Sequence, residues 1–329
     1  MTITPLKLKS YPLAALLSLL IGFFLFDGVA GAATLYVSHY TADKVSVIDT
    51  VKGSVIREIK LDVGANPVGL ALTRDNRHLY VCNRGLGRVS VIDTLTDKVV
   101  KEIPVGLGPY AVTLSPKEDI AYVTNTYSDD IYVIDMKTNA VIRTIKVEEK
   151  PAMAAFTPDG RFAYVTNYLA GSITYIDAST HLALSTLKSV GEHPFGIVAA
   201  PDNRFAYFAN DHSRVSVIDM RNNRIVDHIP VGHAPIAVAV SPAGDIVYVN
   251  NRFGDTVSVI DSGTRKVVKE IKVGEESMRI ALSGDGKYLY VVRGEWREGA
   301  LVIVDTAANE VVKELELWGA PIWIAVDDR

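Results

Sequence analysis

Apolar residues recur along most of the chain in short alternating runs that are separated by turn-forming residues. Residues 110–115, 120–124, 131–135 and 140–147 are four consecutive runs of this kind. They are rich in Val, Ile and Tyr, whose branched or flat side chains pack well on a pleated sheet. The segments between them hold Pro, Asp, Asn and Thr, which favour turns. No ten-residue segment after residue 32 has helical periodicity, so the pattern predicts an all-β fold.

The group of four runs is one unit of a repeat that occurs seven times with a period of 42 to 44 residues. An Ile-Asp or Val-Asp pair closes the third run of each unit, at Asp49, Asp93, Asp135, Asp177, Asp219, Asp261 and Asp305. Four short strands in a unit of this length are typical of a propeller blade. One blade cannot cover both of its apolar faces, whereas seven blades in a ring can. We therefore expect a seven-bladed β-propeller with four antiparallel strands per blade.

The two ends of the repeat complement each other. The first unit starts at residues 35–37 with a second run, and residues 321–326 supply a first run at the other end of the chain. This predicts a closing blade with three N-terminal strands and one C-terminal strand. The only cysteine, Cys82, has no partner in the chain, so closure does not depend on a disulfide, and we expect a buried, inert thiol.

The first 32 residues differ from the repeat. Two lysines precede an apolar stretch at residues 13–26, and Ala30 and Ala32 form a small-x-small site. These features are typical of a secretory signal peptide, so we expect cleavage after Ala32 and a propeller over residues 33–329. An uncleaved anchor is the alternative, although a membrane span needs roughly 20 apolar residues. Cleavage would leave a periplasmic or secreted protein, expected to be a monomer, with no membrane span.

Composition narrows the function classes. A hydrophobic content of 48% with 22% charged residues excludes disorder. The formal net charge of −4 argues against a nucleic-acid-binding protein, because such proteins carry a basic footprint. A protein partner or a small ligand at one face of the ring is the better expectation.

Two units carry the same tetrapeptide, at residues 122–125 and 164–167, which reads Tyr-Val-Thr-Asn. Looser copies lie at residues 80–83, 207–210 and 248–251. The chain resembles the YVTN-repeat, YncE-like β-propellers over nearly all of residues 34–329. The resemblance implies a seven-bladed ring, an extracytoplasmic location and no assigned chemistry. It also implies relatedness to seven-bladed lactonases and heme d1-binding domains.

The resemblance implies that the first run of each unit lines the central channel. Alternation then points the second residue after the unit's Pro, or its equivalent Ser277, into the channel. These residues are Gly69, Ala111, Met153, Gly196, Ala237, Arg279 and Trp323. Arg279 and Trp323 are large and lie on adjacent runs, so we expect them to be neighbours. They form either a site for an anion or a ring, or a packed plug in which Arg279 pairs with Glu275, Glu276 or a carbonyl group.

The resemblance also implies that the loops before the first run and between the second and third runs share one face, where ligands commonly bind. Five units end their second run with Asn, which we interpret as bonded to backbone groups in the next turn. His39 and Arg293 replace this Asn in the first and last units. The candidate ligand-binding residues are Arg279, Trp323, Arg293, His39, Trp296 and Trp318. Other residues expected on this face are Tyr40, Arg84, Tyr127, Tyr168, Arg252, Phe253 and Arg297.

The sequence offers weak signals for a metal or a cofactor. His193, His212 and His233 lie on loops but match no known ligand spacing. No Cys-x-x-Cys-His motif occurs, which excludes covalent heme c within this chain. A non-covalent heme d1 would need an axial ligand such as His39 or His193. No motif identifies a catalytic residue or a cofactor.

Three functions remain open at this point. The first is an exported, non-enzymatic binding or scaffold propeller that engages a ligand or protein through the face at the channel mouth. The second is a metal-dependent, lactonase-like hydrolase, which would need converging carboxylate, His and Arg side chains. The third is a cofactor or redox accessory of an exported dehydrogenase or cytochrome.

Overall fold

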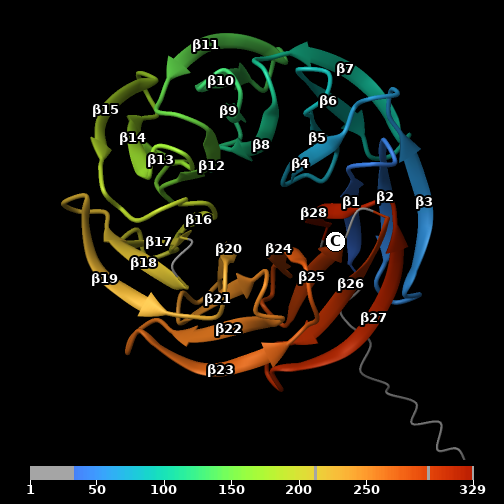
Figure 1. Cartoon of the computed structure of the whole chain (residues 1–329). Coiled ribbons are helices and arrows are strands. Elements are labelled where there is room, and N and C mark those ends of the chain that lie inside the picture. The colour runs from blue at the N-terminus through green and yellow to red at the C-terminus, as the bar shows by residue number, and fades with distance from the viewer. Residues whose placement is uncertain (1–32, 211–212, 295–296, 328–329) are drawn as a thin grey trace, which may run out of the picture.

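The computed structural model of the chain describes residues 33–210, 213–294 and 297–327, and every regular element in these residues is a β-strand. The strands form seven four-stranded sheets, which surround a central channel as the blades of a ring (Figure 1). Neighbouring strands in each sheet pair in the antiparallel direction. The predicted all-β, seven-bladed propeller is confirmed.

The closing blade joins the two ends of the described chain. It contains β28 (Pro321–Asp327), β1 (Thr34–His39), β2 (Lys44–Asp49) and β3 (Ser54–Lys60) in that order. Strands β1 and β28 pair from Thr34↔Asp327 to His39↔Pro321. Three N-terminal strands and one C-terminal strand therefore make this blade, as predicted.

The other six blades follow the chain in order. The second and third blades contain β4 (Pro67–Leu72), β5 (His78–Asn83), β6 (Arg88–Asp93), β7 (Lys98–Pro104), β8 (Pro109–Leu114), β9 (Ile120–Asn125), β10 (Asp130–Asp135) and β11 (Ala140–Lys146). The fourth and fifth contain β12 (Pro151–Phe156), β13 (Phe162–Asn167), β14 (Ser172–Asp177), β15 (Leu182–Leu187), β16 (Ile197–Ala199), β17 (Phe205–Asn210), β18 (Arg214–Asp219) and β19 (Arg224–Pro230). The sixth and seventh contain β20 (Pro235–Val240), β21 (Ile246–Asn251), β22 (Thr256–Asp261), β23 (Lys266–Lys272), β24 (Ser277–Leu282), β25 (Tyr288–Gly294), β26 (Glu298–Asp305) and β27 (Glu310–Trp318).

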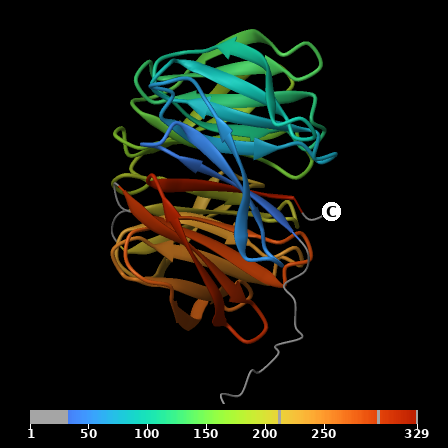
Figure 2. The ribbon, with the colours of Figure 1, turned by 90° about the vertical axis from the view of Figure 1, so that its right-hand side faces the viewer.

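The first strand of each sheet lies nearest the channel, and the fourth lies at the rim (Figure 1). Seen from the side, the ring is a disc whose connecting loops gather on two opposite faces (Figure 2). Each inner strand runs between these faces, so its first residues lie at one mouth of the channel and its last residues at the other.

The hydrophobic core lies between the blades rather than inside one globule. Each blade interface holds one apolar cluster; that between the closing and second blades includes Tyr36, Val47, Val68 and Leu79. The second strand of a blade is buried along almost its whole length, because both of its faces contact other blades. Burial of each large apolar side chain stabilises the fold by about 1.5–3 kcal/mol. The high apolar content of the chain is therefore explained by burial of apolar side chains on both faces of every blade.

The Tyr and Thr of the repeated tetrapeptide connect neighbouring blades. Tyr80 Oη donates to Asn139 Oδ1 at 2.7 Å, which joins the second blade to an outer turn of the third. Thr124 Oγ1 donates to the Ala152 carbonyl at 2.9 Å, and Thr166 Oγ1 donates to the Phe195 carbonyl at 2.7 Å. Each of these carbonyl groups lies at or just before the inner strand of the next blade. The tetrapeptide is therefore an inter-blade connector.

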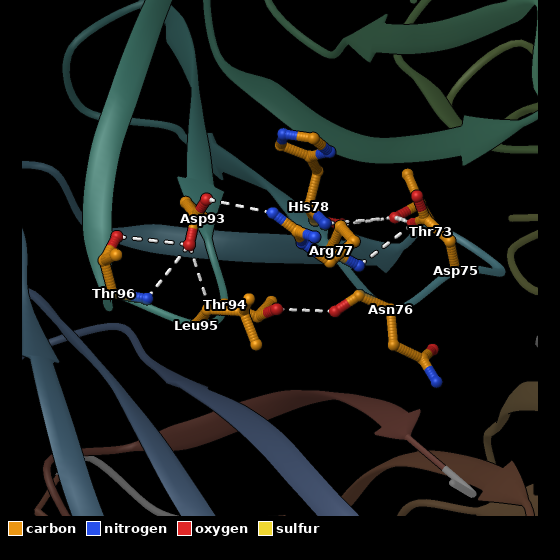
Figure 3. A network of polar contacts seen from close by, with 9 residues as sticks. All are labelled: Thr73, Asp75, Asn76, Arg77, His78, Asp93, Thr94, Leu95 and Thr96. Carbon is orange, nitrogen blue, oxygen red and sulfur yellow. Dashed lines mark hydrogen bonds and ion pairs between the residues drawn. The ribbon is translucent and has the colours of Figure 1, made fainter.

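The repeated Asp at the end of the third strand organises the following turn. In the second blade, Asp93 Oδ1 accepts hydrogen bonds from the amides of Leu95 and Thr96 at 3.0 and 2.9 Å (Figure 3). A second turn in the same network has Asp75 Oδ1 accepting from Thr73 Oγ1 at 2.6 Å. Thr94 Oγ1 joins the two turns by donating to the Asn76 carbonyl. The Asp residues serve turns, as expected, and do not converge on one site.

The Asn residues at the ends of the second strands are structural, and most of their partners differ from those expected, although Asn210 Nδ2 also donates to the Val190 carbonyl at 3.3 Å. Asn83 Nδ2 donates to Ser90 Oγ at 2.6 Å, and Asn125 Nδ2 donates to Asp130 Oδ1 at 3.0 Å. These acceptors are side chains of the third strand rather than backbone groups of the turn. Because an antiparallel neighbour brings its side chains beside the Asn, the amide bonds across the pair.

Cys82 is completely buried and unpaired, as expected, and burial raises the pKa of its thiol. Within the part of the chain that the structure describes, no helix is long and apolar enough to span a membrane. The predicted signal peptide lies outside the described residues.

Candidate functional site

A pocket of about 660 Å³ opens at one mouth of the channel, and we call it the mouth pocket. Its walls come from the loops after the second strands and from the segments that lead into the inner strands. The described residues that line it are Tyr40, Arg84, Tyr110, Thr126, Tyr127, Lys150, Ala152, Tyr168, Phe195, Arg252, Glu276, Met278, Gly294, Ala320 and Ile322. Its volume falls within the usual range for small-molecule sites.

Aromatic rings form one continuous wall of the mouth pocket. The Tyr110 ring packs edge-on against Phe195 with their centroids 5.6 Å apart, and Phe195 packs edge-on against Tyr168 at 5.7 Å. Tyr110 also contacts Trp323, deeper in the channel, at 5.8 Å. Such edge-on contacts favour defined ring orientations. The wall therefore offers preformed surfaces for a flat ligand.

Cationic side chains stand above this aromatic wall. The Arg84 guanidinium carbon lies 5.0 Å from the Tyr127 ring centroid and 5.7 Å from that of Tyr110, and Arg84 Nη2 donates to Tyr127 Oη at 2.6 Å. Arg252 forms an ion pair with Glu276, with 2.9 Å between Arg252 Nη2 and Glu276 Oε2. Lys150 adds a third cation to the lining, whereas Glu276 is its only carboxylate among the described residues. The pocket is thus positive in a chain of net charge −4.

Arg279 and Trp323 lie together in the channel, as their adjacent inner strands predict. The Arg279 guanidinium carbon is 3.4 Å from the Trp323 ring centroid, and Arg279 Nη2 donates to Met153 Sδ. Each of the two side chains is 6% exposed. Met153 belongs to the fourth blade and Arg279 to the seventh, so the guanidinium reaches across the ring.

Arg279 has no carboxylate partner among the described residues, since Glu276 is paired with Arg252. A packed plug was expected to pair Arg279 with Glu275, Glu276 or a carbonyl group, whereas the acceptor seen is Met153 Sδ. Burial lowers the pKa of Arg279 to about 10, which leaves the side chain charged at neutral pH. Removing a charge from water costs several kcal/mol, while a desolvated cation–π contact contributes about 2 kcal/mol. The contact with Trp323 alone therefore offsets only part of the general cost of burying a charge.

Small residues occupy most other channel positions for a packing reason. A Cβ added to Gly69 would lie 2.5 Å from the Tyr110 carbonyl oxygen, and one on Gly196 would lie 2.5 Å from that of Ile236. Both contacts involve the backbone of the next inner strand, which cannot move aside easily. The inner strands approach so closely that only Gly fits at these two positions.

Arg293 and Trp318 do not line the mouth pocket, although the pocket that they line shares Glu276 and Gly294 with it. They line a second pocket of about 480 Å³ on the seventh blade, together with Glu275, Glu298 and Glu316. Arg293 forms an ion pair with Glu314, and Trp318 is 61% exposed. Trp296 lies outside the described residues. The structure therefore does not bring these candidates together with Arg279 and Trp323.

His39 is buried at 1% exposure and does not line the mouth pocket. Burial and the nearby Lys44 lower its pKa to about 4, while the Trp318 backbone and Glu58 oppose this shift. Neither ring nitrogen makes a hydrogen bond of normal geometry with the described residues. Because the imidazole is enclosed, His39 is not placed as an axial ligand for a tetrapyrrole in the mouth pocket.

The histidines considered for a metal are not brought together. The His193 ring stacks on Tyr168 with centroids 4.5 Å apart, and His233 lies 5.9 Å from the Phe253 ring. His212 lies outside the described residues. Among the described residues, no three His, Cys, Asp or Glu side chains are grouped so that they could hold a metal ion.

The sequence analysis missed several residues of the mouth pocket, above all Tyr110, Phe195, Met278 and Ile322. Each follows the unit's Pro, or its equivalent, by one position. The inner strands carry a bulge at this point, as between Pro109 and Ala111. A bulge breaks the two-residue period, so alternation could not assign this position. The sequence did contain a signal for these pocket residues, because large apolar residues recur at the position directly after the unit's Pro.

Two family sequence models match parts of the chain. Residues 24–154 match the YNCE-like beta-propeller, and residues 161–264 match the Cytochrome D1 heme domain. The first match and the seven-bladed ring confirm the resemblance stated from the repeat. A comparison with curated protein sequences found no match.

Solved structures share the fold at low sequence identity. A functionally unknown protein from Desulfotomaculum acetoxidans has a TM-score of 0.78 and 20% identity, covering 89% of this chain and 98% of its own. Kuenenia stuttgartiensis hydrazine synthase has a TM-score of 0.73 and 20% identity, with coverage of 92% and 99%. Dihydro-heme d1 dehydrogenase NirN in complex with DHE has a TM-score of 0.66 and 17% identity, with coverage of 89% and 74%. At these identities the likeness shows the fold alone.

Proposed function

We propose that the protein is a non-enzymatic binding propeller whose mouth pocket holds a flat, negatively charged small molecule. The observation that carries the proposal is the pairing of an aromatic wall with an excess of cations in one pocket of about 660 Å³. Tyr110 and Phe195 offer ring faces and edges, while Arg84 and Lys150 offer charge. Rings and cations on one surface favour a ligand that combines a π-system with an anionic group.

The hydrolase alternative finds less support in the same pocket. Metal-assisted hydrolysis needs several carboxylate or His ligands around one ion. Glu276 is the only carboxylate among the described lining residues, and Arg252 is paired with it. The lining suits binding better than this chemistry.

Binding of a matched pair of probes tests the proposal. Naphthalene-2-carboxylate and the neutral naphthalene-2-carboxamide have the same ring system but differ in charge. We expect calorimetry to show tighter binding of the carboxylate, weakened about tenfold or more by Arg84→Gln, since a hydrogen bond to a charged group contributes about 1.5–3 kcal/mol. Arg74→Gln is the matched control, because Arg74 lines the opposite mouth of the channel. Equal binding of both probes, or equal effects of both substitutions, would contradict the proposal.

A tetrapyrrole is the second candidate ligand, and the Cytochrome D1 heme domain match over residues 161–264 favours it. That segment contributes Tyr168, Phe195 and Arg252 to the mouth pocket. A tetrapyrrole is flat, and its acidic groups would suit Arg84 and Lys150. A bound heme iron would supply redox or ligand-binding chemistry. The described lining offers Tyr and Met side chains towards such a metal but no His.

Absorption spectroscopy tests this second candidate. We expect both hemin and metal-free protoporphyrin IX to bind with shifted absorption bands, because the aromatic and cationic contacts do not depend on iron. Arg84→Gln should weaken both, and Arg74→Gln should weaken neither. No spectral change with either compound at about 10 μM protein, a concentration that detects micromolar affinity, would exclude a tetrapyrrole site.

We also propose that the protein is exported as a periplasmic or secreted monomer after removal of residues 1–32. The proposal rests on the sequence pattern of this segment. N-terminal sequencing of the protein from its natural source should find Ala33 first. An intact N-terminus, or recovery from the cytoplasmic fraction alone, would refute it.

A further inference from the structure

Arg279 lies between the two mouths of the channel. Its strand β24 enters at the mouth pocket, which Met278 lines, and ends at the opposite mouth, which Ala281 and Leu282 line. Trp323 has the same place on β28, between Ile322 and Ile324. The cation and the indole therefore lie between the residues that line the two mouths, beneath the mouth pocket but not among its lining residues.

The guanidinium has unused hydrogen-bonding capacity at this place. It carries five N–H donors, and the one hydrogen bond it makes with the described residues goes to the thioether of Met153. A thioether sulfur is a weak acceptor. Trp323 covers one face of the guanidinium, but its indole ring is not a conventional hydrogen-bond acceptor for the N–H groups. The remaining donors stay available along the edge of the group.

The charged groups near Arg279 are mainly positive, so they do not neutralise its charge. Burial raises the pKa of Tyr110, and the charges of Arg279, Arg84 and Arg252 all oppose that shift. Three arginines therefore act on one phenol that lines the mouth pocket. Among the described residues, Glu276 is the nearby carboxylate of the lining, and it is paired with Arg252. An anion next to Tyr110 would therefore lie near three positive charges.

We propose that Arg279 forms a second, deeper anion site beneath the mouth pocket, next to its lining residue Tyr110, which takes a small oxyanion such as a carboxylate or a phosphate. Arg279 would offer its planar donor edge to the oxyanion while Trp323 holds the other side of the guanidinium in place. The oxyanion is either a free ion or the acidic group of the ligand in the mouth pocket. Only the second source rests on the proposed function.

Fluorescence of Trp323 tests the site directly. The chain has three tryptophans, so Trp296→Phe with Trp318→Phe leaves Trp323 as the only indole. Formate and inorganic phosphate are then titrated at constant ionic strength. We expect a saturable change in emission, lost in Arg279→Met and weakened about tenfold in Arg279→Lys, because Lys keeps the charge but lacks the planar fork. Arg74→Gln, at the opposite mouth of the channel, is the matched control and should retain the change.

A second measurement keeps the test valid if a variant folds poorly. The melting temperature of the unmodified protein should rise with phosphate concentration, because a ligand that binds the folded state stabilises it. Arg279→Met should lose this dependence. The site is refuted if neither the free ions nor naphthalene-2-carboxylate gives a saturable signal in the unmodified or single-tryptophan protein, or if Arg279→Met keeps the signal.

The two sources of the oxyanion give different results. Saturation by free phosphate or formate identifies a free-ion site. A response to naphthalene-2-carboxylate alone, absent with its carboxamide, identifies the acidic group of a mouth ligand. If that probe binds with dependence on Arg84 but not on Arg279, the proposed function stands and the deeper site is refuted. If free ions bind at Arg279 while the probes do not bind, the deeper site stands and the proposed function fails.

Discussion

The guanidinium carbon of Arg279 lies 3.4 Å from the centroid of the Trp323 indole, at the centre of a ring that is otherwise lined at this level largely by small residues. The two side chains come from the last two inner strands of the ring, β24 and β28. This contact distinguishes one side of the channel from the rest of a nearly regular repeat.

Replacing the buried cation should separate a structural role from a binding role. We expect Arg279→Met to leave the free energy of unfolding unchanged or to raise it by about 1–4 kcal/mol, because apolar side chains often stabilise a site that held buried charge. Urea denaturation measures the change, with Met153→Leu as a control that should cost less than about 1.5 kcal/mol. A loss of more than about 2 kcal/mol in Arg279→Met would instead identify a packed plug.

His39 should make stability depend on pH. Its pKa in the folded protein is about 4, against 6.5 in the unfolded chain, so the unfolded state binds more protons between these values. The free energy of unfolding should therefore fall as the pH decreases from 6.5 to 4, with about 3 kcal/mol lost from this residue below pH 4. Denaturation at several pH values measures the slope.

The repeat suggests a control variant for the His39 prediction. His39→Asn introduces the residue that five other units carry at this position. The variant should lose less stability than the unmodified protein over this pH interval, while carboxylates affect both proteins alike. Parallel pH curves for the two proteins would show that His39 is not buried in its neutral form.

A methyl group on an inner strand should be poorly tolerated. Gly69→Ala would place its Cβ 2.5 Å from the Tyr110 carbonyl oxygen and 2.8 Å from the Ala111 Cα. We expect a cost of about 1–3 kcal/mol, because overpacking forces the backbone apart. Gly263→Ala is the control, since the nearest atom to its added Cβ would be 3.5 Å away. Thermal denaturation should show a lower melting temperature for Gly69→Ala only, and equal values would contradict the close approach of the inner strands.

Loss of the last strand should open the ring. Deletion of residues 320–329 removes β28, which pairs with β1 and buries Trp323. We expect the melting temperature to fall by on the order of 10 °C or more, since loss of one buried Trp costs about 3–5 kcal/mol. Deletion of residues 328–329 alone is the control. An unchanged melting temperature after the longer deletion would show that the other six blades hold the fold without closure.

Much of the fold could be predicted because every blade repeats the same local pattern. The runs expected at residues 110–115 and 120–124 correspond to β8 (Pro109–Leu114) and β9 (Ile120–Asn125). Alternation and turn residues determine such boundaries locally, and seven copies of the pattern remove most ambiguity. The closing blade was also predictable, because the first unit lacks its inner strand and residues 321–326 supply an inner strand without a following blade.

The site was predicted less completely, for two physical reasons. Alternation placed Arg279 beside Trp323, but the bulge near Pro109 hid the position that brings Tyr110 into the mouth pocket. The pocket also draws side chains from all around the ring, so its shape depends on closure rather than on any one segment. Arg293 illustrates this limit, since it breaks the repeat near Arg279 yet lines the neighbouring pocket rather than the mouth pocket.

The pairing of β1 with β28 also constrains how the protein forms. Thr34 pairs with Asp327, so this contact closes a longer loop than any other strand pairing among the described residues. A chain growing from the ribosome cannot complete its first blade until its last strand has emerged, and until then it presents an open edge at β1. Closure is therefore expected to be a late and slow step of folding. Once made, the same contact slows unfolding, because the ring has no free end from which its strands could peel away.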